Sequence, residues 1–311
     1  MSGPVPGRGS APVVALVDRF GSADDVRRGL GPAPVEVVTS TAVPAGPGIV
    51  AVLAGPETPL TEAHLDALPD LRIVAATSAG TDHVPVDAVT ARGAWVTSTA
   101  GYCTDEVADH TIALVLGLLR GVTTLDSAVR AGRWDVMEAA PRRIAGTVLG
   151  VVGFGATGRA VAERATALGM RVVPVSRATP RPEFLSLLAE VDVVSLHVPH
   201  RPGSPPVLDA AAIAALRPGA FVVNVARGGV LDTAALGSAL RSGQVAGAAL
   251  DVLPVEPPPA DDPVLTFPRT VLTPHAAWYS PAASVRPYVR AGAAVAAVLA
   301  GREPDRVVGR P

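Results

Sequence analysis

The chain has 311 residues, of which 49% are hydrophobic and 17% are charged, and its formal net charge is −2. This length allows two domains with separate cores, and the composition excludes an intrinsically disordered chain. The nearly balanced charge excludes a basic field that would attract nucleic acid or anionic lipid, so we expect neither as a partner. All 26 basic residues are arginine, which excludes a lysine Schiff base and a lysine general base.

Cys103 is the single cysteine of the sequence, which excludes an internal disulfide and a cysteine-based zinc cluster, and we expect no metal site. The first ten residues lack the apolar core of a signal peptide. No stretch approaches the about 20 apolar residues of a membrane span. We therefore expect a cytoplasmic protein that does not bind a membrane.

Short β-branched runs alternate with helical segments in the first 100 residues. Alternation of this kind predicts a parallel sheet that is covered by helices on both faces. The predicted strands are 13–18, 35–39, 49–53, 72–76 and 94–97, and the predicted helices are 23–30 and 61–68.

A long helix is predicted from Thr104 to about Arg120, with Thr104 as its N-cap and acidic residues in its first turn. A second series of strands and helices follows, so the chain is predicted to be an α/β protein with two parallel-sheet domains. The strands of this series are 148–152, 171–175, 192–197, 220–225, 247–253 and 271–273, and its helices are 157–168, 209–216, 233–242 and 281–300.

A glycine fingerprint follows the predicted strand 148–152 and precedes a predicted helix, which is the setting that a dinucleotide site requires. The first glycine permits a tight turn, the second lets a pyrophosphate approach the backbone, and the third lets the helix pack on the strand. The alternative is a glycine-rich turn that binds no ligand. The fingerprint consists of Gly153, Phe154, Gly155, Ala156, Thr157 and Gly158.

The end of the second strand of such a unit selects the nucleotide. A site for NAD usually carries an acidic residue there, which binds the ribose 2′-hydroxyl. This chain has Ser176 and Arg177 instead, with Arg181 nearby. A guanidinium suits a 2′-phosphate, so we predict NADP(H) in preference to NAD(H). If Arg177 is only a solvated loop residue, NAD(H) remains acceptable.

Three polar residues, Arg227, Glu256 and His275, follow later strands or turns of the second series. A guanidinium at a strand end can bind a carboxylate and polarise the adjacent carbonyl. A histidine can donate a proton to a developing alkoxide when a neighbouring carboxylate keeps it charged. Taken singly, Arg227 suggests a surface ion pair and His275 a structural histidine, but their order behind a dinucleotide fold favours catalysis.

These motifs resemble the D-isomer-specific 2-hydroxyacid dehydrogenase family, and the resemblance covers nearly all of the chain from Val13 to about Gly301. The segment Thr273–Ser280 is especially similar to C-terminal-binding proteins, the branch that includes transcriptional corepressors. The motifs that carry the resemblance are the fingerprint, 192–199, 224–232 and 273–275.

The resemblance implies that His275 is the acid/base, Glu256 its partner and Arg227 the clamp for the substrate. Trp278 would line the pocket and favour apolar or thioether side chains on the keto acid, unless it is a core or interface aromatic. Further substrate contacts are implied for Ser78, Ala79, Gly80, Thr81 and Tyr102. Cofactor contacts are implied for the fingerprint, Ser176, Arg177, His197, Val198, Pro199, Ala226 and Asp251.

The resemblance also implies a discontinuous architecture. Residues 1–100, completed by 278–311, would form a flavodoxin-like substrate domain, and residues 101–277 a Rossmann domain, with the cofactor and substrate cleft between them. A homodimer built on the cofactor domain is expected. The arm-like segment Arg130–Met137, with Trp134, is a candidate contact, although Trp134 could equally be an anchor within its own domain.

We therefore expect a reversible reductase of 2-keto acids to D-2-hydroxy acids, with a small keto or hydroxy acid as its partner. Glu256 argues against a formate dehydrogenase, because that branch carries glutamine at the matching position, whereas a phosphite dehydrogenase is not excluded. The alternative from another class is a nucleotide-sensing interaction protein of the corepressor type, with weak or vestigial dehydrogenase activity. The physiological keto acid stays open.

Overall fold

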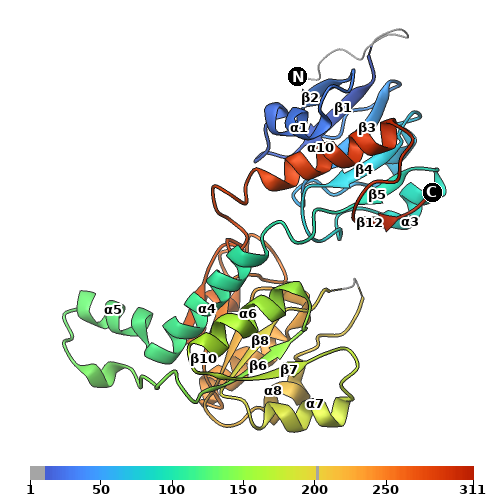
Figure 1. Ribbon diagram of the computed structural model, residues 1–311. Helices are drawn as coiled ribbons and strands as arrows, with labels where there is room; N and C mark the ends of the chain where they lie inside the picture. The colour runs from blue at the N-terminus through green and yellow to red at the C-terminus, as the bar shows by residue number, and fades with distance from the viewer. Residues whose placement is uncertain (1–10, 201–202) are drawn as a thin grey trace. The chain divides into compact units, whose positions relative to one another are not determined.

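The computed structural model describes residues 11–200 and 203–311, which form two compact units (Figure 1). The first unit comprises the described residues up to Cys103 together with Tyr279–Pro311, and the second comprises Thr104–Trp278. The sequence placed the corresponding boundaries after residues 100 and 277. Each unit is an α/β structure built around its own sheet.

The first unit contains a six-stranded sheet in the order β12-β5-β4-β3-β1-β2. Its neighbouring strands are parallel, except that β12 pairs with β5 in the antiparallel direction. The order of the parallel strands is the flavodoxin-like order that was expected. The strands are β1 (Val13–Val17), β2 (Glu36–Thr39), β3 (Ile49–Ala54), β4 (Ile73–Ala76), β5 (Trp95–Thr97) and β12 (Val307–Gly309).

Helices cover both faces of this sheet. One face carries α1 (Ala23–Leu30) and α10 (Arg286–Leu299), and the other carries α2 (Glu62–Asp66) and α3 (Val86–Ala91). The helices α1 and α10 approach so closely that a Cβ added to Gly292 would lie 2.3 Å from a backbone oxygen of α1. The C-terminal helix is therefore part of the core of the first unit.

The C-terminal helix is shorter than predicted. It begins at Arg286, because residues 281–285 form turns, and a proline stands in its first turn, where a missing N–H leaves no hydrogen bond unmade. The edge strand β12 was not predicted either. It is only three residues long, and its pairing with β5 depends on a contact between distant parts of the chain.

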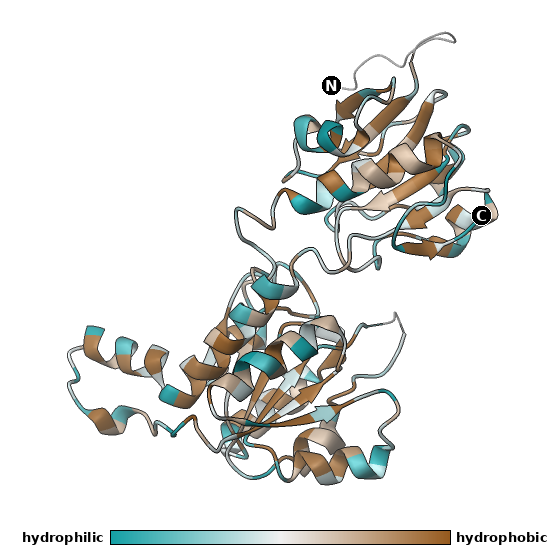
Figure 2. Ribbon diagram, viewed as in Figure 1, coloured by the Kyte–Doolittle hydropathy of each residue, from teal (hydrophilic) through white to brown (hydrophobic). Residues whose placement is uncertain are grey.

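The second unit contains a six-stranded, fully parallel sheet in the order β11-β10-β9-β8-β6-β7. Its strands are drawn mostly in the hydrophobic colour in Figure 2, and β6, β8 and β9 are buried along their whole length, as expected for a sheet covered on both faces. The strands are β6 (Val148–Val152), β7 (Arg171–Val175), β8 (Val193–Leu196), β9 (Ala220–Asn224), β10 (Val245–Leu250) and β11 (Thr270–Leu272).

Helices α4 (Thr104–Arg120) and α6 (Ala156–Ala167) pack on one face of this sheet. The other face carries α7 (Arg181–Leu188), α8 (Ala210–Ala215) and α9 (Thr233–Ser242). Thr104 is the first residue of α4 and not its N-cap, which corrects the prediction by one position. Helices α7 and α5 (Val122–Arg130) were not predicted.

Among the described residues, no single helix combines the length and the hydrophobicity of a membrane span. The helices α4 and α5 meet these criteria only when they are taken together, and the pair is bent by 61°.

Candidate active site

The carboxyl edge of the sheet in the second unit is where the predicted functional residues of this unit gather. Strand β6 lies between β7 and β8, so the chain leaves β6 toward one side and returns on the other. Ligands of doubly wound sheets bind outside the carboxyl ends of the strands at such a switch point. The glycine fingerprint follows β6 and the segment 197–199 follows β8, so both stand at this point.

The fingerprint has the geometry of a tight strand-to-helix turn. Gly153 has a φ of 99°, and a Cβ at this position would lie 2.5 Å from the carbonyl oxygen of His197. A Cβ on Gly158 would lie 2.1 Å from the carbonyl oxygen of Gly153. Gly153 therefore excludes a side chain because of both its backbone conformation and its close contact, and Gly158 excludes one because of its close contact.

The start of helix α6 fits the phosphates of a dinucleotide. Its N-cap is Gly155, which provides no side chain to accept from the free N–H groups of the first turn. A Cβ added to Gly155 would meet none of the non-adjacent described residues within 4 Å, so the space beside the N-cap is open. Unpaired N–H donors and the positive end of the helix dipole suit an anion at this place.

A neutral histidine stands beside the fingerprint. His197 follows β8, and its Nε2 lies 2.8 Å from the hydroxyl of the fully buried Ser195. Burial lowers the pKa of His197 from 6.5 to about 4, because a charged imidazolium would lose its hydration. The ring is therefore uncharged at neutral pH. Val198 and Pro199 continue the same segment at the switch point.

Two arginines after β7, Arg177 and Arg181, differ in their surroundings. Ser176 and Arg177 are exposed, and the Ser176 hydroxyl accepts from the N–H of Ala178 at 3.2 Å. Arg181 donates from Nη2 to Asp209 Oδ1 at 2.5 Å. Asp209 is the N-cap of α8, so Arg181 is held by the second unit itself. Arg177 is exposed, and no ion pair joins it to another of the described residues.

The pair His275 and Glu256 has the geometry of a histidine oriented by a carboxylate. His275 Nδ1 lies 2.7 Å from Glu256 Oε2, and the two side chains are 39% and 34% exposed. Glu256 Oε1 accepts from the N–H of Leu253 at 2.7 Å, which fixes the carboxylate on its own loop. Nδ1 therefore faces an acceptor, and Nε2 is the ring nitrogen left to exchange a proton with a ligand.

Burial alone would raise the pKa of Glu256. The hydrogen bonds from His275 and from the N–H of Leu253, with the positive charges of His275 and Arg227, outweigh this effect and hold the pKa below its ordinary value. Glu256 is therefore a carboxylate at neutral pH. The influence of Arg227 on this pKa also shows that the three predicted catalytic residues belong to one electrostatic neighbourhood.

Asn224 is a residue of this site for which the sequence suggested no role. It is fully buried at the end of β9, its Nδ2 donates to the carbonyl of Arg227 at 2.9 Å, and its Oδ1 accepts from the N–H of Ala226 at 3.1 Å. The Arg227 guanidinium donates to the carbonyl of Ala226 at 2.8 Å. Asn224 thus shapes the turn that carries Arg227. An amide inside the apolar run Phe221–Val225 was the available signal.

Asp251 and Trp278 are the two remaining predicted site residues of the second unit. Asp251 is buried, and its carboxylate accepts from the N–H groups of Ala276 and Ala277 at 2.8 and 3.0 Å. Its side chain therefore acts on the protein backbone, and its predicted contact with a cofactor stays a prediction. Trp278 is partly buried, and its predicted place beside the keto acid also stays a prediction.

The remaining predicted substrate residues belong to the first unit. The loop Ser78–Thr81 follows β4, and the Ser78 hydroxyl donates to the carbonyl of Gly80 at 2.7 Å. Tyr102 is only 6% exposed, and burial raises its pKa far above the ordinary value, so its hydroxyl stays protonated. The substrate contacts of these residues stay predictions.

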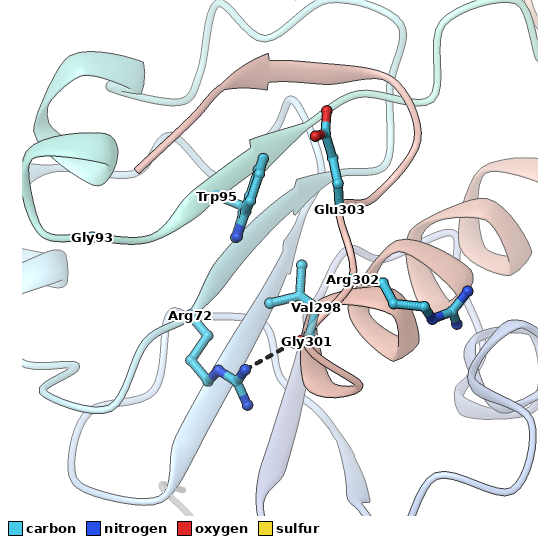
Figure 3. A pocket seen from close by; sticks show the side chains of 7 residues that line it. All are labelled: Arg72, Gly93, Trp95, Val298, Gly301, Arg302 and Glu303. Atoms are coloured by element: carbon cyan, nitrogen blue, oxygen red, sulfur yellow. Dashed lines mark hydrogen bonds between the residues drawn. The ribbon is translucent and has the colours of Figure 1, made fainter.

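A hollow of about 230 Å³ in the first unit is a different feature (Figure 3). Arg72 precedes β4, and Trp95 begins β5, so the hollow lies at the amino ends of these strands. The loop Ser78–Thr81 lies at the opposite, carboxyl end of β4. None of the predicted site residues lines the hollow, which is formed by Arg72, Gly93, Trp95, Val298, Gly301, Arg302 and Glu303.

The pKa of His197 makes a pH-dependent contribution to stability. Between about pH 4 and 6.5 the folded chain binds fewer protons at this ring than the unfolded chain does, so the contribution is complete above pH 6.5 and is lost as the pH falls toward 4. We expect the loss to be about 2–3 kcal/mol. Urea unfolding of wild type and His197→Gln at pH 7.5 and 4.5 measures it. Equal pH dependence of the two proteins would contradict the assignment.

Comparison with known proteins places this geometry in a family. The model of the D-isomer specific 2-hydroxyacid dehydrogenase NAD binding domain matches residues 112–277. A glyoxylate reductase of Thermofilum pendens is 34% identical over 262 residues, which cover 79% of this chain and 77% of that protein. A D-3-phosphoglycerate dehydrogenase of Mycobacterium leprae is 35% identical over 282 residues, or 85% of this chain, but the match spans only 52% of that longer protein.

A solved structure supports the same relationship. The NADPH-dependent glyoxylate/hydroxypyruvate reductase of Sinorhizobium meliloti, in complex with NADP and malonate, is 28% identical, has a TM-score of 0.82 and covers 97% of this chain and 99% of its own. These relatives give no support to the expected similarity with C-terminal-binding proteins or to the corepressor alternative. The chain belongs to the D-isomer specific 2-hydroxyacid dehydrogenase family, whose NAD(P)-dependent members are oxidoreductases acting on CH–OH groups.

Proposed function

We propose that this chain reduces a small 2-keto acid to a D-2-hydroxy acid with NAD(P)H and also runs the reverse reaction. The observation that carries the proposal is the 2.7 Å contact between His275 Nδ1 and Glu256 Oε2 in the electrostatic neighbourhood of Arg227. The reductases named for glyoxylate and hydroxypyruvate among the relatives support the substrate class. The uncapped start of helix α6 supports the nucleotide.

A bound nicotinamide nucleotide supplies or accepts the hydride. The chain supplies the proton, because Glu256 orients His275 through Nδ1 and leaves a protonated Nε2 to donate to the carbonyl oxygen as it becomes an alkoxide. The negative charge of Glu256 compensates the positive charge of the doubly protonated ring. In the reverse direction, neutral Nε2 takes the hydroxyl proton.

Arg227 provides the positive charge for the substrate. Its guanidinium can bind the keto acid carboxylate and polarise the adjacent carbonyl. The interaction between the guanidinium and the carbonyl oxygen strengthens as negative charge grows on that oxygen. The buried amide of Asn224 fixes the turn on which Arg227 stands. Binding of the same carboxylate by backbone N–H groups of Ser78–Thr81 is part of the proposal, as is the role of Trp278 beside the substrate side chain.

The variant His275→Ala tests the proposed acid. We expect kcat for glyoxylate or hydroxypyruvate reduction to fall about 10²–10⁴-fold, the usual loss when a positioned acid/base is removed. Nucleotide affinity, measured by fluorescence titration, should change less than about twofold, because binding does not need the proton.

The matched control is His64→Ala, which removes a half-buried histidine of α2 in the first unit and should retain wild-type kcat. Turnover by His275→Ala within about tenfold of wild type would exclude His275 as the acid that sets the rate.

We further propose that NADP(H) is preferred over NAD(H). Support comes from the segment after β7, where Ser176 and Arg177 are exposed and no acidic side chain stands between residues 175 and 181. Arg181 is bound to Asp209, so Arg177 is the guanidinium that can meet a 2′-phosphate. The related Sinorhizobium reductase was solved with NADP.

The variant Arg177→Ala tests this preference. Loss of one charged hydrogen bond to the 2′-phosphate should lower kcat/KM for NADPH about 10–100-fold and leave kcat/KM for NADH nearly unchanged. Arg171→Ala removes an exposed arginine from the other end of β7 and should change neither value. The proposal fails if wild type prefers NADH or if both nucleotides lose equally in Arg177→Ala.

We also propose a homodimer built through the segment Arg130–Met137. Its apolar side chains are unusually exposed: Trp134 is 87%, Met137 80% and Val136 76% accessible. Brown, hydrophobic stretches of this segment are visible in Figure 2. Trp134 is too exposed to act as an anchor within its own unit. Aromatic residues and methionine are enriched at the cores of protein interfaces.

The double variant Trp134→Ser/Met137→Ser should raise the dimer dissociation constant at least about 30-fold, since truncation of a central tryptophan often costs about 2 kcal/mol or more. Sedimentation velocity across a concentration series measures this change. Val308→Ser, at an exposed apolar residue of the first unit, is the control. A wild-type protein that is monomeric at micromolar concentration would refute the dimer.

We propose the cytoplasm as the place of this reaction, because the reaction consumes or produces the reduced nicotinamide nucleotide. Fractionation of the source cells would test this location. Recovery of the protein with the membrane or outside the cell would refute it.

A further inference from the structure

The backbone of His275 adopts an uncommon conformation. Its φ is 53°, in the left-handed region that residues with a Cβ seldom occupy. Such a conformation is strained and persists only where surrounding contacts determine it. The contacts that hold this turn therefore decide where the imidazole of His275 stands.

Asp251 makes most of these contacts. Its carbonyl oxygen accepts from the N–H of His275 at 2.8 Å. Its carboxylate accepts from the N–H of Ala276 through Oδ1 at 2.8 Å and from the N–H of Ala277 through Oδ2 at 3.0 Å. One buried residue at the end of β10 thus binds three consecutive N–H groups of the turn, so the orientation of its carboxylate sets the path of the backbone.

A side chain from helix α4 completes this arrangement. The hydroxyl of Thr273 lies 2.5 Å from Asp251 Oδ1 and 3.2 Å from His110 Nε2. Because the hydroxyl hydrogen points to the carboxylate, the hydroxyl oxygen is free to accept a hydrogen from His110 Nε2. His110 Nε2 is also 3.6 Å from Asp251 Oδ1. The direction of donation is thus from His110 to Thr273 to Asp251.

We propose that His110 is a positioning residue for His275, an inference that rests on the proposed reductase function. His110 holds the Thr273 hydroxyl in the rotamer that donates to Asp251, and Asp251 in turn holds the left-handed turn. Without His110 the hydroxyl can rotate away, the carboxylate loses one of its three donors, and the turn relaxes. A displacement of about 1 Å at a catalytic group can cost 10²-fold in rate.

A positioning role for His110 and a simple packing role predict different effects on kcat and on the melting temperature. The side-chain contacts of His110 are with Thr273 and Asp251, which hold the turn of His275, so its loss should lower kcat and leave the KM values for nucleotide and keto acid nearly unchanged. A packing residue would lower the melting temperature without a selective effect on kcat. Glutamine can place an N–H donor near the position of the imidazole Nε2, so it should restore the function of a positioning donor.

The experiment compares His110→Leu, His110→Gln, Thr273→Val and the double variant His110→Leu/Thr273→Val by steady-state kinetics. We expect kcat to fall about 10–100-fold in His110→Leu and to recover to within about threefold of wild type in His110→Gln. The double variant should be no slower than the slower single variant, because both changes break one chain of hydrogen bonds. Asp109→Asn is the matched control, since Asp109 is the neighbouring residue and pairs with Arg164 at 2.5 Å.

A second measurement does not depend on substrate. Hydrogen exchange of the Ala276 and Ala277 amides should be about tenfold faster in His110→Leu than in wild type, and wild-type-like in His110→Gln. If wild type reduces no keto acid, the reductase proposal fails while the exchange rates still decide whether His110 orders the turn. Wild-type kcat and exchange in His110→Leu would overturn the inference. The inference would also be overturned if His110→Leu changed only KM, or if kcat stayed low in His110→Gln.

Discussion

The candidate site depends on one geometric constraint, which is that parallel strands end at a common edge of their sheet. In the second unit this edge collects the fingerprint after β6, the neutral His197 after β8, the Arg227 turn after β9 and Asp251 after β10. Residues that are widely separated in sequence therefore meet without any local sequence signal that joins them. Gly153 and Gly158 leave no room for a Cβ, which shows how closely the fingerprint packs against this edge.

Buried polar side chains convert this coarse arrangement into a defined geometry. Asn224 and Asp251 are almost completely buried, and each uses its side chain to bind backbone groups of the turn that carries a predicted catalytic residue. Unsatisfied, such groups would each cost about 1–3 kcal/mol, so the turns are held by the need to satisfy them. The backbone turns that carry Arg227 and His275 are thus held by buried side chains of the unit, and the partly exposed Glu256 then orients the imidazole of His275.

The sequence predicted most of this fold, because its strands are nearly continuous β-branched runs and its fingerprint stands between a strand and a helix. The family resemblance also implied Glu256 as the carboxylate partner of His275, and the two side chains are in contact. The left-handed backbone of His275, the pairing of Arg181 with Asp209 and the contact of His110 with Thr273 could not be predicted, because each depends on contacts that only the tertiary structure makes. The helix α7 was missed although a proline in its first turn is a common sign of a helix start.

The most direct test of the account is the initial rate of NADPH and NADH oxidation by the wild-type protein at neutral pH. The panel of 2-keto acids should run from glyoxylate and hydroxypyruvate to branched, thioether and aromatic acids, and chiral analysis should identify the product. The account predicts turnover with at least one keto acid, equal amounts of nucleotide oxidised and D-2-hydroxy acid formed, and a higher kcat/KM with NADPH. Demonstrated nucleotide binding without reduction of any acid in the panel, or formation of the L-hydroxy acid, would contradict it.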